Sequence, residues 1–337
     1  MAAYRKFDLV REFVPPAPLR NAHLMTIAGA FWRRRFPRLP PAETREFETE
    51  PGTRVLVKCH WQKKPRAHST IVLLHGLEGS CDSGYMQGVA ESAFREGFNV
   101  LRANQRNCGG TDHLTPSLYN SGLSADIRAI VMELIERDNL SEIFVAGFSM
   151  GGNLVLKMAG EFADRFPSEL KAVIGICASC DLAACADALG KPENYFYQRH
   201  FVSRLKAHMC AKAALFPERY PLNGIENVRT VREFDDVITA RFCGFRDADD
   251  YYYQSSALRV AGSIRVPTVI IAAQDDPMVP FHTFGDASLA GNANIEIIAP
   301  KYGGHCAFVS RESGDERFWA EARVVEIFKS CAALAGS

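Results

Sequence analysis

Short apolar runs recur along this chain and alternate with stretches in which apolar residues repeat at helical spacing. Short apolar runs bounded by polar residues are typical of buried parallel strands, and the helical stretches between them are typical of crossover connections. We therefore expect an α/β fold in which a mostly parallel sheet is covered by helices on both faces. The expected strands are 55–57, 71–74, 100–103, 143–146, 173–177, 268–273 and 295–298.

Two covering helices can be placed from the spacing of their apolar residues. Segment 125–138 places five apolar side chains on one helical face, namely Ile127, Ile130, Val131, Leu134 and Ile135. Segment 315–328 begins with acidic residues and continues with apolar residues at helical spacing. An acidic first turn is typical of a helix start, so this segment is expected to be the last covering helix.

The segment 181–262 interrupts the alternation and is rich in aromatic residues. It lies between two expected core strands, so an insertion there should cover the carboxyl edge of the sheet, where open α/β folds bind ligands. We expect a core formed by 1–180 and 263–337, with an N-terminal arm over about 1–45 and an inserted helical cap at 181–262. Most of its aromatic side chains should fill a small core within the insert.

Composition limits the functional class. The chain has 337 residues with 47% hydrophobic and 23% charged residues, and 39 basic residues balance 39 acidic ones. This is the composition of a soluble globular protein, without the basic excess that is typical of nucleic-acid binding. The one basic cluster, Arg33-Arg34-Arg35, follows the apolar stretch 27–32. That stretch is too short to span a bilayer; peripheral membrane contact is one interpretation, and a solvated turn after a packed segment is the favoured one.

The cysteines and the N-terminus predict a cytoplasmic protein. Ten cysteines occur without a repeating spacing, and 1–6 lacks the apolar core of a secretory signal. Cys177 and Cys180 form a C-x-x-C pair, but no second pair completes a zinc site, and the pair ends a strand instead of opening a helix. We interpret these residues as buried thiols and expect no metal.

The candidate nucleophile is Ser149, in the sequence Gly147-Phe148-Ser149-Met150-Gly151. The sequence follows the strand 143–146 and precedes a helix-like segment, which is the context of a nucleophile elbow. Gly147 and Gly151 are the small neighbours that let the serine adopt a strained turn. A phosphate-binding loop would need the pattern G-x-x-x-x-G-K-[ST], which this sequence lacks.

A serine nucleophile needs a histidine base and an acid that orients the histidine, and in this kind of fold the chain order is Ser, acid, His. Asp275 and Asp276 follow the strand 268–273. We choose Asp276 because it lies four residues before Pro280, and Asp275 is the alternative. His305 follows the last expected strand and two glycines, so it is the predicted base.

The main rival to His305 is His75, which directly follows the strand 71–74. That position belongs to the loop that helps to form the oxyanion hole, so His75 is predicted to hold this loop in place. Attack of the serine on a carbonyl group places a negative charge on the carbonyl oxygen, and this oxyanion must be stabilised by backbone N–H groups on two sides of the nucleophile. The predicted donors are the N–H groups of Leu77 and Met150.

Taken together, these motifs resemble the YheT-like branch of the α/β-hydrolases, a group with plant and mammalian lipid-cleaving members. The resemblance covers about 13–328 and is carried by nine segments: 13–16, 19–24, 75–80, 106–110, 147–153, 234–235, 251–252, 272–280 and 303–305. It implies an α/β-hydrolase fold with an eight-stranded sheet, and a serine hydrolase that cleaves small-molecule carboxylic esters, with lipids among the candidates, without a cofactor.

The sequence departs from the family pattern near the expected pocket. Arg106-Asn107-Cys108 stands where R-G-C is usual, and Met25 replaces the usual Gln. Ester hydrolysis through an acyl-enzyme is the function we expect. Two alternatives remain open, which are acyl transfer to an alcohol by the same triad and a non-catalytic binding or scaffold role on the same fold.

Overall fold

The computed structural model describes residues 11–335, and its centre is an eight-stranded sheet with the strand order β1-β2-β4-β3-β5-β6-β7-β8. The strands are β1 (Glu43–Glu50), β2 (Thr53–His60), β3 (Thr70–Leu74), β4 (Asn99–Ala103), β5 (Ile143–Phe148), β6 (Leu170–Ile176), β7 (Thr268–Ile271) and β8 (Ile295–Ile298). β2 pairs antiparallel with β1 and β4, and all other neighbours are parallel. The predicted mostly parallel α/β sheet is confirmed. The segment 1–6, on which the argument about a secretory signal rested, lies outside the described residues.

β1 was not among the expected strands, and its residues explain why. It carries charge at most positions and buries only Phe47 fully, so it has no apolar run to detect. Arg45 stacks on the Phe47 ring and binds Glu133 and Asp138, each at 2.6 Å. A charged outer strand of this kind opposes edge-to-edge pairing between molecules.

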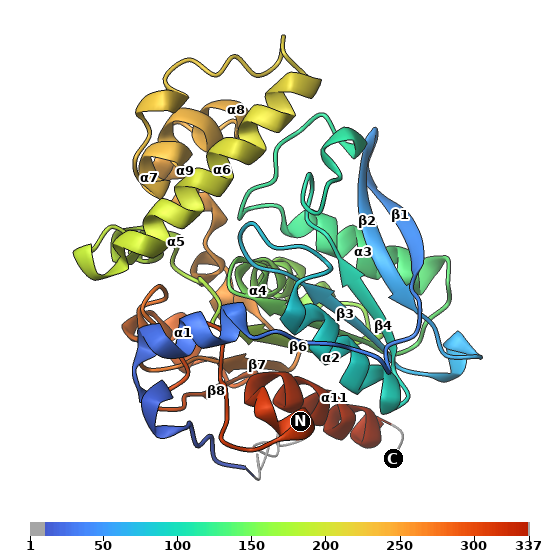
Figure 1. The fold of residues 1–337 in the computed structure, drawn as a ribbon. Coiled ribbons are helices and arrows are strands. Elements are labelled where there is room, and N and C mark those ends of the chain that lie inside the picture. Colours follow the sequence, from blue (N-terminus) through green and yellow to red (C-terminus); the bar gives the residue numbers. More distant parts are fainter. Residues whose placement is uncertain (1–10, 336–337) are drawn as a thin grey trace.

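Helices cover both faces of the sheet, as the sequence pattern predicts (Figure 1). α3 (Ser124–Glu136) and α4 (Met150–Phe162) pack on one face, and α2 (Gly84–Arg95) and α11 (Trp319–Ala335) pack on the other. α3 and α11 are the two helices expected from spacing. α11 starts later than expected because a 3-10 turn, Gly314–Arg317, occupies its first predicted residues.

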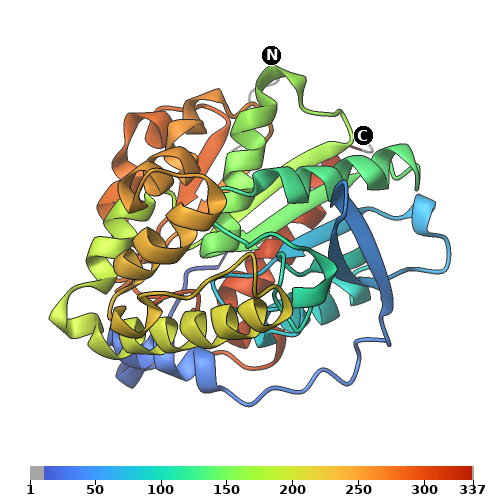
Figure 2. The same ribbon diagram turned by 90° about the horizontal axis from the view of Figure 1, so that it is seen from above.

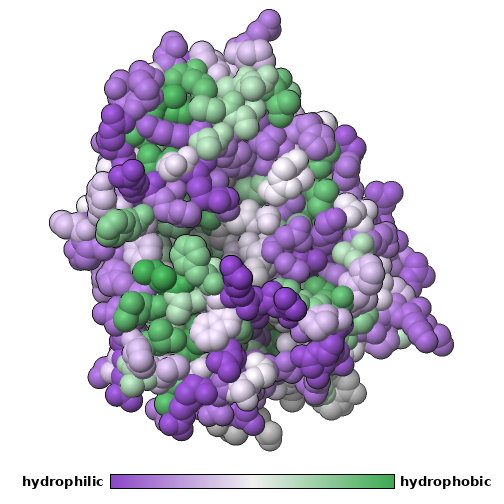
Figure 3. Space-filling model, in the orientation of Figure 1, coloured by the Kyte–Doolittle hydropathy of each residue, from purple (hydrophilic) through white to green (hydrophobic). Residues whose placement is uncertain are grey.

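The N-terminal arm contains a helix that the sequence analysis did not assign. α1 (Ala22–Phe31) begins after Asn21, whose side-chain oxygen accepts the N–H groups of His23 and Leu24 at 3.0 Å and so caps the helix. Its inner side carries the buried Met25, whose sulfur accepts the Val309 N–H. Apolar side chains also gather on the molecular surface over α1 (Figure 3).

The chain between β6 and β7 forms a group of helices at the carboxyl edge of the sheet, drawn in yellow and orange (Figures 1 and 2). We call 181–262 the insert. Its α-helices are α5 (Leu182–Leu189), α6 (Tyr195–Leu215), α7 (Val231–Phe234), α8 (Arg241–Cys243) and α9 (Ala248–Ser255), and a π-helical turn (Asp235–Ala240) joins α7 to α8. Most of its aromatic side chains pack within two apolar clusters of the insert, as expected.

Candidate active site

The loop between β5 and α4 holds Ser149 in a strained conformation. Ser149 has φ 53° and ψ −118°, a region that non-glycine residues rarely occupy. The turn closes so tightly that a Cβ on Gly147 would lie 2.2 Å from the Gly151 carbonyl oxygen, and a Cβ on Gly151 would lie 2.4 Å from the His75 carbonyl oxygen. Glycine is therefore required at both positions, and the serine hydroxyl is presented at the end of β5.

Three side chains from the ends of three strands meet at this turn. His305 Nε2 lies 2.9 Å from Ser149 Oγ, and His305 Nδ1 lies 2.9 Å from Asp276 Oδ2. The Asp276 side chain is 2% exposed and that of His305 is 13% exposed. The structure thus brings the predicted nucleophile, base and acid together, in the order that a catalytic triad needs.

The two neighbouring carboxylates have different surroundings. Asp276 Oδ1 accepts the N–H groups of Met278 at 2.8 Å and Val279 at 3.0 Å, which leaves Oδ2 for His305. Asp275 Oδ1 instead accepts the Gly304 N–H at 2.9 Å, and burial raises the pKa of its carboxyl group. Asp276 therefore contacts the histidine directly, and Asp275 holds the loop that carries it.

α1 also holds His305, a contact that the sequence analysis missed. The His305 N–H donates to Thr26 Oγ1 at 2.9 Å, and the Thr26 hydroxyl donates to the Ala22 carbonyl at 2.8 Å. Thr26 is a residue of α1, and it is buried where this helix meets the loop that carries His305, which we call the histidine loop. The segment 19–24 had signalled a family resemblance, but nothing in a single sequence shows which distant loop this helix touches.

Charges around His305 control its protonation. Burial by itself lowers the pKa of the imidazole, but the negative charges of the Asp276 carboxylate and the Cys306 thiolate outweigh this effect and raise the pKa of His305 well above its usual range. The Cys306 thiol lies beside both His305 and the buried Cys177, whose sulfur accepts the Cys306 N–H at 3.4 Å. The imidazole therefore keeps its proton to a higher pH than an isolated histidine does.

The two predicted thiols of the C-x-x-C pair are buried and unbridged, as expected. Only Cys177 of that pair approaches the site, where the ligand atoms of Cys177, His305 and Cys306 lie within 4.8 Å of one another. Both ring nitrogens of His305 are already engaged by Ser149 and Asp276. A metal ion bound by the His305 ring would therefore have to displace one of these contacts.

The loop after β3 lies against the nucleophile. A Cβ on Gly76 would lie 3.1 Å from Ser149 Cβ, so the chain that leads to Leu77 passes directly beside the serine. Leu77 and Met150 both line the cavity at Ser149, and within 11–335 neither N–H group donates a hydrogen bond. Two free N–H groups at this position are what an oxyanion requires.

His75 does not contact the serine. Its Nδ1 pairs with the Gly76 carbonyl at 2.8 Å, and its Nε2 accepts the Gln105 N–H at 3.0 Å. Complete burial lowers the pKa of His75 to about 4, so the ring is neutral at ordinary pH. These contacts agree with the prediction that His75 holds the loop after β3.

A cavity of about 130 Å³ opens at Ser149 and His305. Most of its lining residues belong to the insert, and most of those are apolar, for example Leu189, Phe201, Leu205 and Met209. An apolar cavity beside an activated hydroxyl is suited to an acyl chain whose carbonyl meets the serine.

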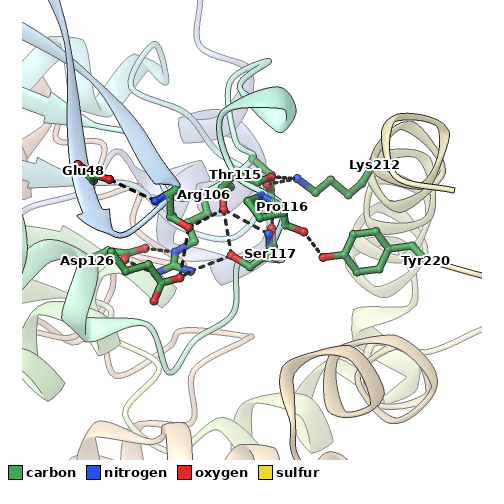
Figure 4. Close-up of polar contacts among 12 residues, drawn as sticks. Glu48, Arg106, Thr115, Pro116, Ser117, Asp126, Lys212 and Tyr220 are labelled. Atoms are coloured by element: carbon green, nitrogen blue, oxygen red, sulfur yellow. Dashed lines mark hydrogen bonds and ion pairs between the residues drawn. The ribbon is translucent and has the colours of Figure 1, made fainter. Parts of the chain in front are cut away.

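Polar contacts fasten α6 and the segment after it to the core beside this cavity. Lys212 binds Asn107 Oδ1 at 2.8 Å and the carbonyl oxygens of Asp112 and Thr115, and Tyr220 binds the Pro116 carbonyl (Figure 4). The loop that receives them is held in turn by Arg106, which pairs with both oxygens of Asp126 at 2.6 Å.

A charged cluster adjoins these contacts. His208 of α6 lies 2.9 Å from Glu78 and 3.1 Å from Asp112. Burial lowers the pKa of His208, but the two carboxylates outweigh it and raise the pKa to about 9. The sequence analysis did not predict this cluster, because its members are separated in the chain and no motif contains them.

Comparison with known proteins places the chain in a family. Residues 69–308 match the family described as alpha/beta hydrolase fold. Putative esterase YheT of Escherichia coli is 30% identical over 95% of this chain and 93% of its own length. Medium-chain fatty acid ethyl ester synthase/esterase 2 of Saccharomyces cerevisiae is 26% identical over 77% of this chain and 61% of its own length.

Solved structures agree on the fold. The esterase Pf2001 of Pyrococcus furiosus superposes with a TM-score of 0.55 and 18% identity, over 86% of this chain and 92% of that protein. The sheet order, the family match and the similarity to YheT agree with one another. The chain therefore belongs to the alpha/beta hydrolase fold family of esterases and lipases, in the branch that contains YheT.

Proposed function

We propose that this protein is a serine esterase that hydrolyses carboxylic esters of apolar acyl chains. The observation that carries the proposal is the line of contacts from Ser149 Oγ through His305 to Asp276, at 2.9 Å for each step. Nucleophile, base and orienting acid in hydrogen-bond contact are the arrangement that activates a serine hydroxyl. Its position at the mouth of an apolar cavity supports an acyl substrate.

The proposed reaction proceeds in two halves. His305 Nε2 takes the Ser149 proton as Oγ attacks the ester carbonyl, and the oxyanion is held by the N–H groups of Leu77 and Met150. Protonated His305 then gives its proton to the leaving alcohol, which leaves an acyl-enzyme on Ser149. In the second half, His305 takes a proton from water as the water oxygen attacks the acyl carbon. The bond from that carbon to Ser149 Oγ then breaks, Oγ receives the proton back from His305, and the free acid leaves. Asp276 keeps the Nδ1 proton of His305 in place throughout.

The residues that line the same cavity also support a domain organisation. We assign 181–262 as a cap on a hydrolase core that comprises 1–180 and 263–337. The insert supports this role because it has its own apolar clusters and also supplies most of the cavity wall. A cap of this kind excludes water from the acyl chain and leaves the ester at the serine.

Reaction with a fluorophosphonate probe tests the nucleophile. The wild-type protein should be labelled, and Ser149→Ala should lose labelling together with ester turnover, by on the order of 10³-fold or more. Ser179→Ala is the matched control because Ser179 is a second serine that lines the same cavity. Labelling that persists in Ser149→Ala, or that is lost in Ser179→Ala, would contradict the assignment.

Acyl transfer to an alcohol is the second candidate. It is supported by the similar yeast protein, whose name combines an ethyl ester synthase with an esterase. An acyl-enzyme can be released by an alcohol when the site admits it in place of water. Product analysis with and without added ethanol separates the two, because a transferase forms ethyl ester as the main product and a hydrolase forms free acid.

A further inference from the structure

Exposed apolar side chains are concentrated on one part of the surface. Within the described residues, eight large hydrophobic side chains are exposed, and six of them lie on α1, at its end, or in the first turn of α6. These six form what we call the apolar patch: Leu24, Ile27, Phe31, Trp32, Tyr195 and Phe196. Monomeric proteins rarely group exposed apolar residues in this way without a binding partner.

The patch is one surface because α1 and α6 touch. His23 of α1 stacks on Tyr197 of α6 with ring centroids 5.7 Å apart, and their side chains approach to 3.2 Å. Leu24, Ile27 and Phe31 follow at helical spacing on the outer side of α1. Figure 3 shows apolar side chains grouped over this helix.

Exposed basic residues flank the two chain segments that carry the patch. Arg20 precedes α1, Arg33 and Arg35 follow it, and Lys191 and Arg199 lie on either side of the α6 residues; all five are exposed. The segments 20–35 and 191–199 contain one acidic residue, Glu193. In the described part of the chain, none of the five basic side chains forms a hydrogen bond or an ion pair. Arg34 is the exception within its cluster, because it pairs with Glu321 at 2.6 Å and stacks on Phe318.

The patch also borders the candidate active site. Thr26, on the inner side of α1, binds the His305 backbone, and Phe201, on the next turn of α6 after Tyr197, lines the cavity. A surface that rests on the patch would therefore lie close to the candidate active site. No helix of residues 11–335 combines the length and apolar character needed to cross a bilayer.

We infer that the apolar patch is a docking surface for a bilayer that contains anionic phospholipid. Leu24, Ile27, Phe31 and Phe196 enter the boundary between head groups and acyl chains, and the flanking arginines and lysine meet lipid phosphates. Exposed apolar side chains beside basic residues are the pattern of a segment that rests on a membrane surface. The two segments that carry the patch hold five exposed basic residues against one acidic residue, a charge that complements anionic lipid head groups.

Vesicle co-sedimentation tests the inference with the 337-residue chain. The wild-type protein should sediment with vesicles of phosphatidylcholine and phosphatidylglycerol, more strongly than with phosphatidylcholine alone, and added salt should weaken binding. The double variant Phe31→Ser with Phe196→Ser should lose binding by about tenfold or more, because two large apolar groups no longer leave water. These side chains are 78% and 80% exposed, so their replacement leaves the packed interior intact.

A matched control comes from the two exposed apolar residues outside the patch. Leu215 and Tyr253 are 52% and 61% exposed, and Leu215→Ser with Tyr253→Ser removes comparable surface from elsewhere on the insert. This control should bind vesicles as the wild-type protein does. Replacement of Arg33 and Arg35 by Glu should reduce binding to the anionic vesicles only.

Several outcomes would overturn the inference. One is a wild-type protein that does not sediment with either vesicle, and another is an equal loss of binding in the patch and control variants. A third is a wild-type dimer by light scattering that the patch variant converts to a monomer, because a second copy of the chain would then cover the patch. Ser149→Ala should bind vesicles normally, so failure of the esterase proposal and failure of this one can be told apart.

Discussion

Asp275 and Asp276 are adjacent in the chain, yet their side chains bind different groups. Asp276 Oδ2 contacts His305, whereas Asp275 accepts the Gly304 N–H. Asp276→Asn should lower kcat by on the order of 10²-fold to 10⁴-fold, because an amide no longer holds the required tautomer of the histidine.

Asp275→Asn is the matched comparison at the neighbouring position. An Asn oxygen can still accept the Gly304 N–H, so this variant should lose much less activity. Steady-state kinetics with one ester as the substrate measures kcat for Asp276→Asn and for Asp275→Asn. If Asp275→Asn proved the more damaging variant, the acid would have to be reassigned.

The pH dependence of activity follows from the raised pKa of His305. The imidazole must be neutral to accept the serine proton, so kcat/KM should increase with pH through one ionisation. Since Asp276 and Cys306 raise the pKa of His305, the midpoint should lie above the ordinary histidine value of about 6.5. In Asp276→Asn the residual activity should show a lower midpoint. A profile that is flat between about pH 5 and 8 would show that His305 does not act as the base.

At the scale of elements, α1 acts as a support for the histidine loop. Thr26→Val keeps the shape of the side chain but removes the acceptor of the His305 N–H. We expect kcat to fall by about tenfold, because a lost buried hydrogen bond lets the base move from its productive position.

Thr26→Ser retains the hydroxyl and is the control, with nearly normal kcat. The pH midpoint should be the same in both variants, because Thr26 positions the base without changing its charge partners. Equal activity of the Val and Ser variants would show that the hydrogen bond has no positioning role.

The elements that could be predicted from sequence are those with a strong local signal. β3, β5 and β6 are buried on both faces and so read as unbroken apolar runs. Ser149, Asp276 and His305 could be chosen because each follows a strand in a fixed chain order. β1 could not be found because Phe47 is its only fully buried side chain. The support by Thr26 and the pairing of His208 with Glu78 depend on contacts between distant segments, which leave no local pattern.

At the scale of the whole molecule, the charged cluster links the insert to the core. His208 faces Glu78 and Asp112, with Lys212 and Arg204 of the same helix nearby. Its pKa in the folded protein is raised to about 9, above the ordinary value. The stability that it contributes should be fully present below about pH 6.5 and lost as the pH rises through about 9, with an upper limit on the order of 3 kcal/mol.

The difference in the free energy of unfolding between the wild-type protein and His208→Gln separates the contribution of His208 from that of Lys212. Denaturant unfolding should show a difference in free energy at about pH 6 that shrinks at about pH 9. His200→Gln, at an exposed position on the same helix, should show little difference at either pH. A difference for His208→Gln that does not change with pH would contradict the assigned ion pairs.

The cavity at the junction of insert and core should select the acyl chain. Each methylene that leaves water contributes roughly 0.8 kcal/mol, about fourfold in kcat/KM, until the cavity is full. Esters of medium-length acids should therefore be better substrates than acetyl esters, and longer chains should again be worse. Values of kcat/KM for a series of p-nitrophenyl esters of increasing acyl length measure this preference. If acetyl esters were the best substrates, the apolar acyl site would be wrong while the assignment of the triad could stand.

The hydrogen bond from His305 to Thr26 spans 279 positions of the chain. It joins α1 to the loop after the last strand, so it has one of the largest loop-closure costs among the described residues. During synthesis, α1 leaves the ribosome long before the segment that it must hold, and it has to wait until nearly the whole sheet has been made. Because His305 follows β8 in the chain, the proposed esterase should become active only after the last strand of its sheet has been made.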